Sequence, residues 1–260
     1  MKQFQGEVLF NGPAMEGVNL MWLRGPEIAA EAQPGQFVLV RCADGYDPLL
    51  RRALSIHRMG LVPGADGARG FALLYGLHGP GTSYLRARRA GDTLDVIAPL
   101  GKGFSVRRDS RYLLLVGGGW GVAPMVALAE QQVARGKSVT LISGAAQASL
   151  QFPVSLLPQE VEVILATVDG SAGHKGMVTD LLPQYWEWAD EMFCCGPMVM
   201  YTGIWEAVTK LWPSKRIQVL AEIGMACGVG ACYACTIHTR RGHKLACVDG
   251  PRFYLSDLMV

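Results

Sequence analysis

The chain has 260 residues, half of them hydrophobic, which is enough for two compact domains and a small appended unit. Its formal net charge of +2 is nearly neutral and gives no electrostatic basis for binding nucleic acid. The seven cysteines are an odd number, which argues against a disulfide-stabilised scaffold. Because the N-terminal segment MKQFQGEVLF has no apolar signal core, the sequence predicts a cytoplasmic protein.

The first part of the chain, residues 1–103, predicts a small antiparallel β-barrel. It contains short strand-like runs bounded by Gly, Pro, Asp or polar residues, and no long helical pattern. The expected strands are Phe4–Phe10, Val18–Leu23, Phe37–Arg41, Leu54–His57, Phe71–Leu77 and Leu94–Ala98. The Gly-, Pro- and Ala-rich insert Gly60–Gly70 predicts a hairpin loop.

Residues 104–221 predict a parallel α/β domain, because buried strands alternate with helices there. The expected strands are Arg111–Val116, Ser138–Ser143, Val161–Thr167, Glu191–Cys195 and Ile217–Leu220, and the expected helices are Val122–Arg135, Val178–Trp188 and Met198–Trp212. The uncharged segment Tyr112–Ala129 is long enough for a membrane span. Its internal glycines and Pro124 favour a strand, a loop and a helix start instead, so we expect no membrane association.

Two motifs in the barrel could contact a nucleotide cofactor. In RRALSIH, the guanidinium of Arg52 could bind a pyrophosphate, and the Ser55 hydroxyl could reach a flavin ring atom. In HGPGTSYL, Gly79 and Gly81 allow close backbone approach, and Thr82 at a helix start could hold a phosphate. Taken singly, each motif also fits an ordinary feature: a solvated arginine at a strand start, or a plain Gly-Pro turn.

Two motifs in the α/β domain could bind a second nucleotide. The run LLLVGGGWGVAP predicts a strand, a glycine loop (Gly117, Gly118, Gly119 and Gly121) and a helix start, where a pyrophosphate can bind. It departs from the strict G-x-G-x-x-G fingerprint, so an ordinary tight turn is equally compatible. Cys195, Gly196 and Pro197 follow a buried strand at the sheet edge where ligands bind in open α/β folds. Cys195 could face a nicotinamide, or could simply be a small core residue.

The last segment, residues 222–260, contains four cysteines in a C-x4-C-x2-C-x11-C arrangement. They are Cys227, Cys232, Cys235 and Cys247. The first three match the plant-type [2Fe-2S] spacing, and the fourth thiolate comes from downstream. A zinc site and a set of buried thiols are the alternatives. The segment has too little apolar periodicity for a core of its own, so metal binding would supply the missing stability.

In combination and order, these motifs resemble the ferredoxin–NADP reductase superfamily. Within it, ACGVGACYAC…CVDGPRF and TVDGSAGHKGMVTDLL (residues 167–182) resemble the electron-transfer subunits of class 1B dihydroorotate dehydrogenases. The resemblance spans nearly the whole chain. It implies an FAD-binding barrel, an NAD-binding domain and a [2Fe-2S] domain. It also implies an FMN-containing catalytic partner in a heterotetramer, and no catalytic side chain in this chain.

The resemblance also implies which residues would contact the cofactors. In the barrel these would be Arg52, Ala53, Leu54, Ser55, Leu74, Tyr75, Gly76, Gly81 and Thr82. Ala53 stands where the family usually has proline. The glycine loop and Cys195–Pro197 would contact NAD. The segment SGAAQASL (residues 143–150) has no cation for a 2′-phosphate, which favours NADH over NADPH, although Lys175 and His174 lie nearby in sequence.

Three other functions fit the same motifs. The chain could serve another complex, such as a hydrogenase or an electron-bifurcating enzyme. It could be an oxygenase reductase. It could also be a non-enzymatic redox or iron sensor, which would need no intact nicotinamide site.

Overall fold

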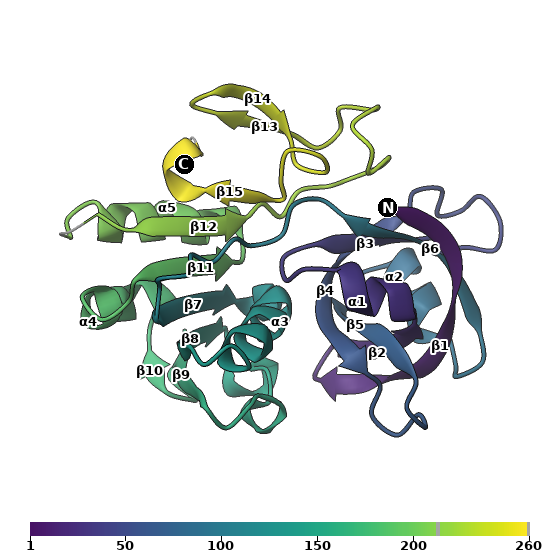
Figure 1. The fold of residues 1–260 in the computed structure, drawn as a ribbon, viewed down its shortest axis with the longest axis horizontal. Helices are drawn as coiled ribbons and strands as arrows, with labels where there is room; N and C mark the ends of the chain where they lie inside the picture. Colours follow the sequence, from purple (N-terminus) through teal and green to yellow (C-terminus); the bar gives the residue numbers. More distant parts are fainter. Residues whose placement is uncertain (212–213, 259–260) are drawn as a thin grey trace.

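The computed structural model describes residues 1–211 and 214–258. Figure 1 shows three parts: a barrel that holds the N-terminus, an α/β domain beside it, and a smaller C-terminal unit that lies along both. The predicted fold class is confirmed. Trp212, where a predicted helix was expected to end, lies outside the described residues.

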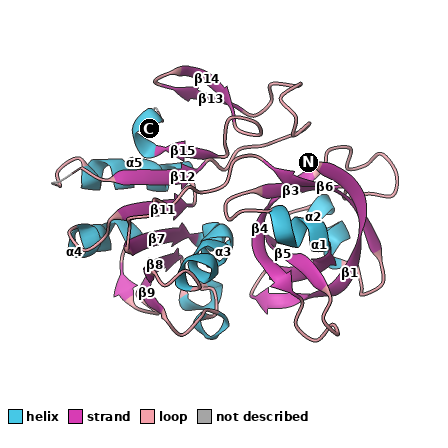
Figure 2. Ribbon diagram, viewed as in Figure 1, coloured by secondary structure: helices cyan, strands magenta, loops and turns pink. Residues whose placement is uncertain are grey.

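The barrel closes in the strand order β1-β2-β5-β4-β3-β6. Its strands are β1 (Lys2–Met15), β2 (Val18–Arg24), β3 (Phe37–Val40), β4 (Arg52–Leu61), β5 (Arg69–Gly76) and β6 (Thr93–Leu100). All six predicted strands are present, several of them longer than expected, and the Gly60–Gly70 insert forms the β4–β5 hairpin connection. Two short helices, α1 (Pro26–Glu31) and α2 (Pro80–Arg86), accompany the barrel (Figure 2). The six residues of α1 are too few to show helical periodicity in the sequence.

The α/β domain contains a seven-stranded sheet in the order β10-β9-β8-β7-β11-β12-β15. Its strands are β7 (Tyr112–Gly118), β8 (Ser138–Ala145), β9 (Val161–Thr167), β10 (His174–Lys175), β11 (Glu191–Cys195), β12 (Arg216–Leu220) and β15 (Arg252–Tyr254). The helices are α3 (Val122–Val133), α4 (Leu182–Trp186) and α5 (Met198–Val208). Where one helix was expected at Val178–Trp188, a 3-10 turn at Val178–Leu181 precedes α4.

The C-terminal unit is attached to the α/β domain by backbone pairing. Its hairpin is β13 (Thr236–Thr239) and β14 (Gly242–Leu245), and β15 then pairs antiparallel with β12. Ala246, Phe253 and Leu255 are buried in the same core as the α/β domain. The unit therefore shares its neighbour's core, in agreement with its weak apolar pattern.

The barrel and the α/β domain meet where β4 packs against α3. The buried His57 ring bonds through Nδ1 to the carbonyl oxygen of Ala123 at 2.9 Å. Next to it, Arg58 Nε lies 2.7 Å from Glu130 Oε1. Because His57 is two residues from Ser55, the interface fixes the predicted flavin strand against the start of α3. Within the described ranges, no helix has the length and apolar character needed to cross a bilayer.

Candidate functional site

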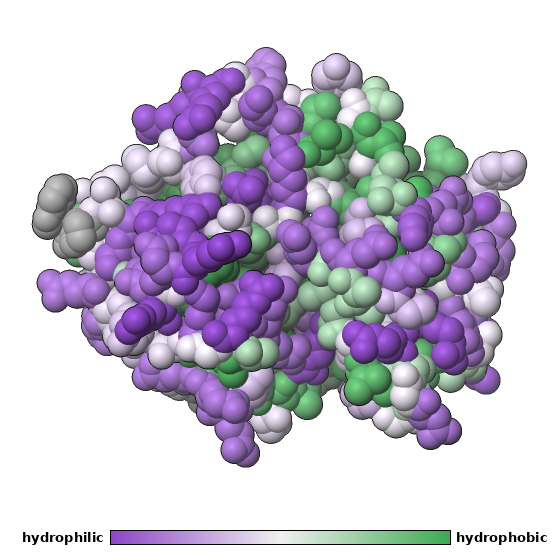
Figure 3. Space-filling view, viewed as in Figure 1, coloured by the Kyte–Doolittle hydropathy of each residue, from purple (hydrophilic) through white to green (hydrophobic). Residues whose placement is uncertain are grey.

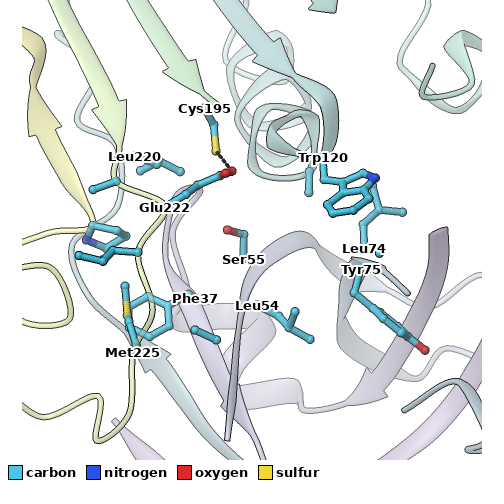
Figure 4. Close-up of a pocket in the computed structure, with 16 residues that line it drawn as sticks. Phe37, Leu54, Ser55, Leu74, Tyr75, Trp120, Cys195, Leu220, Glu222 and Met225 are labelled. Carbon is cyan, nitrogen blue, oxygen red and sulfur yellow. Dashed lines mark hydrogen bonds between the residues drawn. The ribbon is translucent and has the colours of Figure 1, made fainter. Parts of the chain in front are cut away.

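A cleft of about 360 Å³ opens where the three parts of the molecule meet (Figure 4). This volume lies within the range of small-molecule sites. Barrel strands β4 and β5 form one wall, and the ends of β11 and β12 form the other. Its lining includes Phe37, Ala53, Leu54, Ser55, Leu74, Tyr75, Gly76, Trp120, Cys195, Leu220, Glu222 and Met225. We call it the first cleft.

The first cleft brings together the central part of the predicted flavin set. Figure 4 shows the Ser55 hydroxyl pointing into the open space. Tyr75 behaves differently: its ring turns into the barrel, where its hydroxyl donates to Asn11 Oδ1 at 2.9 Å. Tyr75 therefore lines the cleft with its backbone and not with its ring.

Arg52, Gly81 and Thr82 form a cradle beside the first cleft. A Cβ atom on Gly81 would lie 2.7 Å from Arg52 Nε, so the absence of a side chain makes room for the guanidinium. Arg52 Nη1 donates to the Leu50 carbonyl at 2.6 Å. The Thr82 hydroxyl accepts the His78 N–H at 2.8 Å, so this hydroxyl stabilises the turn itself.

A second cleft of about 520 Å³ lies along the carboxyl edge of the parallel sheet. It is lined by Gly118, Gly119, Trp120, Gly144, Ala145, Ala146, Leu150, Val168, Gly176, Met177, Val178, Pro197, Val199, Met200 and Glu222. No lysine or arginine is among these lining residues. Apart from Glu222 they are uncharged, as the segment SGAAQASL predicted.

The four glycines of the glycine loop have two different structural roles. Gly118 and Gly119 line the second cleft, whereas Gly117 and Gly121 permit close backbone packing. A Cβ atom on Gly121 would lie 2.1 Å from the Cys195 carbonyl oxygen, a distance that no side chain could tolerate. The loop is therefore fixed directly against the predicted nicotinamide cysteine.

Cys195 and Glu222 form a hydrogen-bonded pair between the two clefts. The Cys195 thiol donates to Glu222 Oε1 at 3.3 Å, and burial raises the pKa of this thiol well above its usual range. Glu222 opens onto solvent through the clefts, but the surrounding protein desolvates it enough to raise its pKa. The sequence interpretation missed Glu222. The available signal was its position just after a buried parallel strand, at the edge where ligands bind.

A buried tyrosine holds this part of the site in place. The Tyr201 hydroxyl accepts the Gly196 N–H at 3.2 Å and donates to the Leu220 carbonyl at 2.5 Å. It thereby ties the Cys195–Pro197 turn to the end of β12. No local pattern indicates this contact, because the Leu220 partner lies 19 residues from Tyr201 along the chain.

The four predicted metal-binding cysteines are all free thiols on one loop and hairpin. The Val229 N–H points at Cys227 Sγ, 3.5 Å away, and backbone N–H groups, that of Val229 first, lower the pKa of Cys227 to about 6. The Cys247 N–H points at Cys235 Sγ at 3.4 Å, and burial raises the pKa of Cys247. Amides directed at sulfur suit thiolate ligands of an iron–sulfur cluster.

Positive-φ glycines shape the cysteine loop and set it against the barrel. Gly228 has φ +72° and Gly230 has φ +79°. A Cβ atom on Gly228 would lie 2.5 Å from Leu39 Cδ1 on β3, the strand that pairs with β4. No three His, Cys, Asp or Glu side chains in the described ranges are placed to hold a single metal ion. The cluster assignment therefore depends on spacing, on the amides directed at sulfur and on the relatives described next.

Sequence comparison decides the family. A model described as the iron-sulfur cluster binding domain of dihydroorotate dehydrogenase B matches residues 222–259. The dihydroorotate dehydrogenase B (NAD(+)) electron transfer subunit of Geobacillus sp. (strain WCH70) is 36% identical over 265 residues, and the one of Bacillus cereus (strain Q1) is 34% identical over 268. Both matches cover 100% of each chain. The chain belongs to this family of electron transfer subunits.

Solved structures agree with this electron-transfer-subunit family. A structure of NADH-dependent reduced ferredoxin-NADP oxidoreductase superimposes with a TM-score of 0.83 and 28% identity, covering 97% of this chain and 88% of that one. A ferredoxin NADP+ reductase from Neisseria gonorrhoeae has a TM-score of 0.66 at 18% identity, covering 82% of this chain and 93% of that one. The second likeness concerns the fold alone.

Proposed function

We propose that this chain moves electrons between NAD(H) and a partner catalytic subunit, with FAD and a [2Fe-2S] cluster as its cofactors. One observation carries the proposal: the chain from Leu220 to Met225 lines the first cleft, and Cys227 follows two residues later. This short stretch thus borders the cleft that the flavin strand and the nicotinamide turn also line, and it leads directly to the first cluster ligand. Membership of the electron-transfer-subunit family supports the same conclusion.

We assign the cofactors to the three regions already described. FAD would occupy the first cleft, with Ala53, Leu54, Ser55, Leu74, Tyr75 and Gly76 along its ring and with Arg52, Gly81 and Thr82 at its phosphates. NAD would occupy the second cleft along Gly118, Gly119 and Pro197 and reach Cys195. The four cysteines would hold the cluster. These assignments correspond to domains at residues 1–103, 104–221 and 222–260, the last one joined to the second through β15.

The residues around the first cleft suit a hydride transfer. FAD supplies the conversion between the electron pair of a hydride and single electrons, which the cluster carries one at a time. The chain contributes orientation and electrostatics. Ser55 presents a hydroxyl to the cleft, and Cys195 remains a neutral thiol because burial raises its pKa. The neutral Cys195 thiol can therefore donate a hydrogen bond to the Glu222 carboxyl group without adding a negative charge of its own beside the cleft.

NADH should be the preferred nucleotide. The second cleft has no lysine or arginine in its lining to pair with a 2′-phosphate, and the exposed Lys175 is not part of that lining. Stopped-flow reduction of the flavin by NADH and by NADPH compares the two directly. Faster reduction by NADPH would contradict this assignment.

The partner should dock beside the cluster. Residues 223–235 contain no charged side chain, and Val229, Tyr233 and Val248 are exposed. Hydrophobic surface is visible in Figure 3 above the barrel, over the cysteine loop of Figure 1. Interface cores are depleted of charge, which fits this surface. We infer an FMN-containing subunit of the dihydroorotate dehydrogenase type, a heterotetrameric assembly and a cytoplasmic location.

Co-expression with such a catalytic subunit tests the proposal. The chain should co-elute with that subunit in size exclusion, and the complex should oxidise dihydroorotate with reduction of NAD+. The isolated chain should bind FAD and iron with acid-labile sulfide, and should reduce a dye with NADH, but should not oxidise dihydroorotate. If the two chains elute separately without NAD-linked dihydroorotate oxidation, the partner assignment is wrong. An isolated chain that binds neither flavin nor iron would contradict the whole proposal.

A further inference from the structure

Trp120 stands at the junction of the two clefts. Of all the residues that line either cleft, Trp120 and Glu222 are the two that line both. Figure 4 shows them on opposite sides: Glu222 is bonded to Cys195, and the indole of Trp120 lies near Leu74 and Tyr75. A nicotinamide ring that moves from the second cleft toward Ser55 must therefore pass between Trp120 and Glu222.

The indole is held at one side of this passage by two contacts with the barrel. A Cβ atom on Gly76 would lie 2.7 Å from Trp120 Cζ2, so the indole rests directly on the backbone of Gly76. The His78 ring lies 4.2 Å from the Trp120 ring between centroids, at an interplanar angle of 52°. An aromatic contact of this kind shifts an equilibrium by about twofold to tenfold.

The backbone that carries Trp120 has little freedom to move. Gly121 after it packs so tightly on Cys195 that a Cβ atom would lie 2.1 Å from that carbonyl oxygen. Trp120 as a residue is 41% exposed, so solvent is available for the indole to turn into. Rotation of the indole about its own side-chain bonds, away from His78 and Gly76, is therefore the movement that the geometry permits.

We propose that Trp120 is a gate between the two clefts, closed by its contacts with Gly76 and His78 and opened when the indole turns aside for the nicotinamide ring. The inference rests on the proposed function, because it takes the first cleft as the flavin site and the second as the NAD site. A nicotinamide that needs the open state binds with an affinity reduced by the fraction of molecules that are open. Ligands that occupy the second cleft alone escape this reduction.

Two ligands separate the gate from general nucleotide binding. NAD+ carries the nicotinamide ring, and ADP-ribose lacks it. Calorimetric titration of the flavin- and cluster-loaded protein gives a dissociation constant for each, without reliance on turnover. In Trp120→Ala the dissociation constant for NAD+ should fall by about twofold to tenfold, because the closed state is lost. The constant for ADP-ribose should stay unchanged.

A second variant and a matched control keep the test sharp. His78→Ala removes one closing contact from an exposed position, and should shift NAD+ binding in the same direction by a smaller factor. Tyr112→Ala is the control: Tyr112 is 42% exposed, its ring lies 5.4 Å from that of Trp188, and it occupies the opposite end of β7. This variant should bind both ligands as the parent does. Retained flavin and cluster absorption verifies folding in every variant.

Three outcomes would overturn the gate. Unchanged or weaker NAD+ binding in Trp120→Ala would show that the indole does not obstruct the ring. Equal changes for NAD+ and ADP-ribose would place Trp120 against the shared part of the nucleotide. If the parent protein binds neither ligand, the NAD site of the proposed function fails and the gate fails with it, whereas ADP-ribose binding with no Trp120 effect removes the gate alone.

Discussion

The Cys195 thiol is hydrogen-bonded to the Glu222 carboxylate, with the sulfur 3.3 Å from Oε1. The bond links the end of β11 to the residue that begins the cysteine-bearing segment. Desolvation raises the pKa of the thiol, which keeps Cys195 a proton donor at neutral pH. The pair therefore places the carboxyl group of Glu222 at the wall shared by the two clefts.

Glu222→Gln should make the bound flavin easier to reduce. The amide oxygen can still accept the Cys195 hydrogen bond, but the negative charge that opposes electron uptake is gone. We expect the midpoint potential to rise by about 30 mV, which is a tenfold change in the equilibrium constant of a two-electron couple. Potentiometric titration with reference dyes measures it. Glu206→Gln, at an exposed position on α5, is the control and should leave the potential unaltered. An unaltered potential in Glu222→Gln would place the carboxylate outside the influence of the flavin.

Arg52→Ala should weaken retention of FAD. The guanidinium lies over Gly81 in a cradle that a Cβ atom would fill, and a charge-assisted contact with a phosphate contributes about 2 kcal/mol, or roughly a thirtyfold change in affinity. Equilibrium dialysis of flavin from the parent and the variant measures the change. Arg24→Ala removes a barrel arginine that is paired with Glu7 at 2.7 Å, and should retain FAD normally. If both variants retain FAD equally well, Arg52 does not bind the FAD phosphates.

Cys232→Ser should separate the two halves of the electron path. The cluster absorption should be lost or strongly altered, since Cys232 is one of four expected ligands. NADH-dependent reduction of a small dye should survive, because the flavin strand lies in the barrel. Transfer to the catalytic subunit should fail. Undiminished transfer by a cluster-free variant would mean that electrons leave directly from FAD. Cys42→Ser, at a buried barrel cysteine distant in sequence from the loop, controls for thiol loss.

His57 should make the protein lose stability in mild acid. Burial lowers the pKa of His57 to about 3, from an ordinary value of 6.5. Between these values the unfolded chain binds one more proton than the folded chain, so stability falls as the pH falls from 6.5 toward 3. From pH 7 to pH 5 the loss should be roughly 2 kcal/mol. In His57→Asn the side-chain amide can still donate to the Ala123 carbonyl but cannot titrate. Denaturant unfolding of both proteins at pH 7 and pH 5 should show a smaller loss of unfolding free energy in the variant. Equal losses in the two proteins would mean that His57 is not the group responsible.

Local motifs in the sequence indicated where the candidate site should lie, whereas the contacts between distant segments could not be predicted. Short local sequence patterns are enough to recognise the four cysteines, the strand that carries Ser55 and the glycine loop. Glu222 and Trp120 have no such local pattern. Their roles in the site come from tertiary contacts, with Cys195 for Glu222 and with Gly76 and His78 for Trp120. The orientation of Tyr75 could not be read either, since β5 is buried on both faces and shows no alternation. The three residues of β15 are too few for any period, and their pairing with β12 depends on the cysteine loop between them.

The pairing of β15 with β12 also has a consequence for solubility. β12 would otherwise be the outermost strand of its sheet, with a row of free N–H and C=O groups able to template another chain. The segment that bears the cysteines therefore also acts as a protective cover for that edge. If loss of iron loosens the segment, the first visible result should be self-association of the protein through an uncovered strand, before any failure of the barrel.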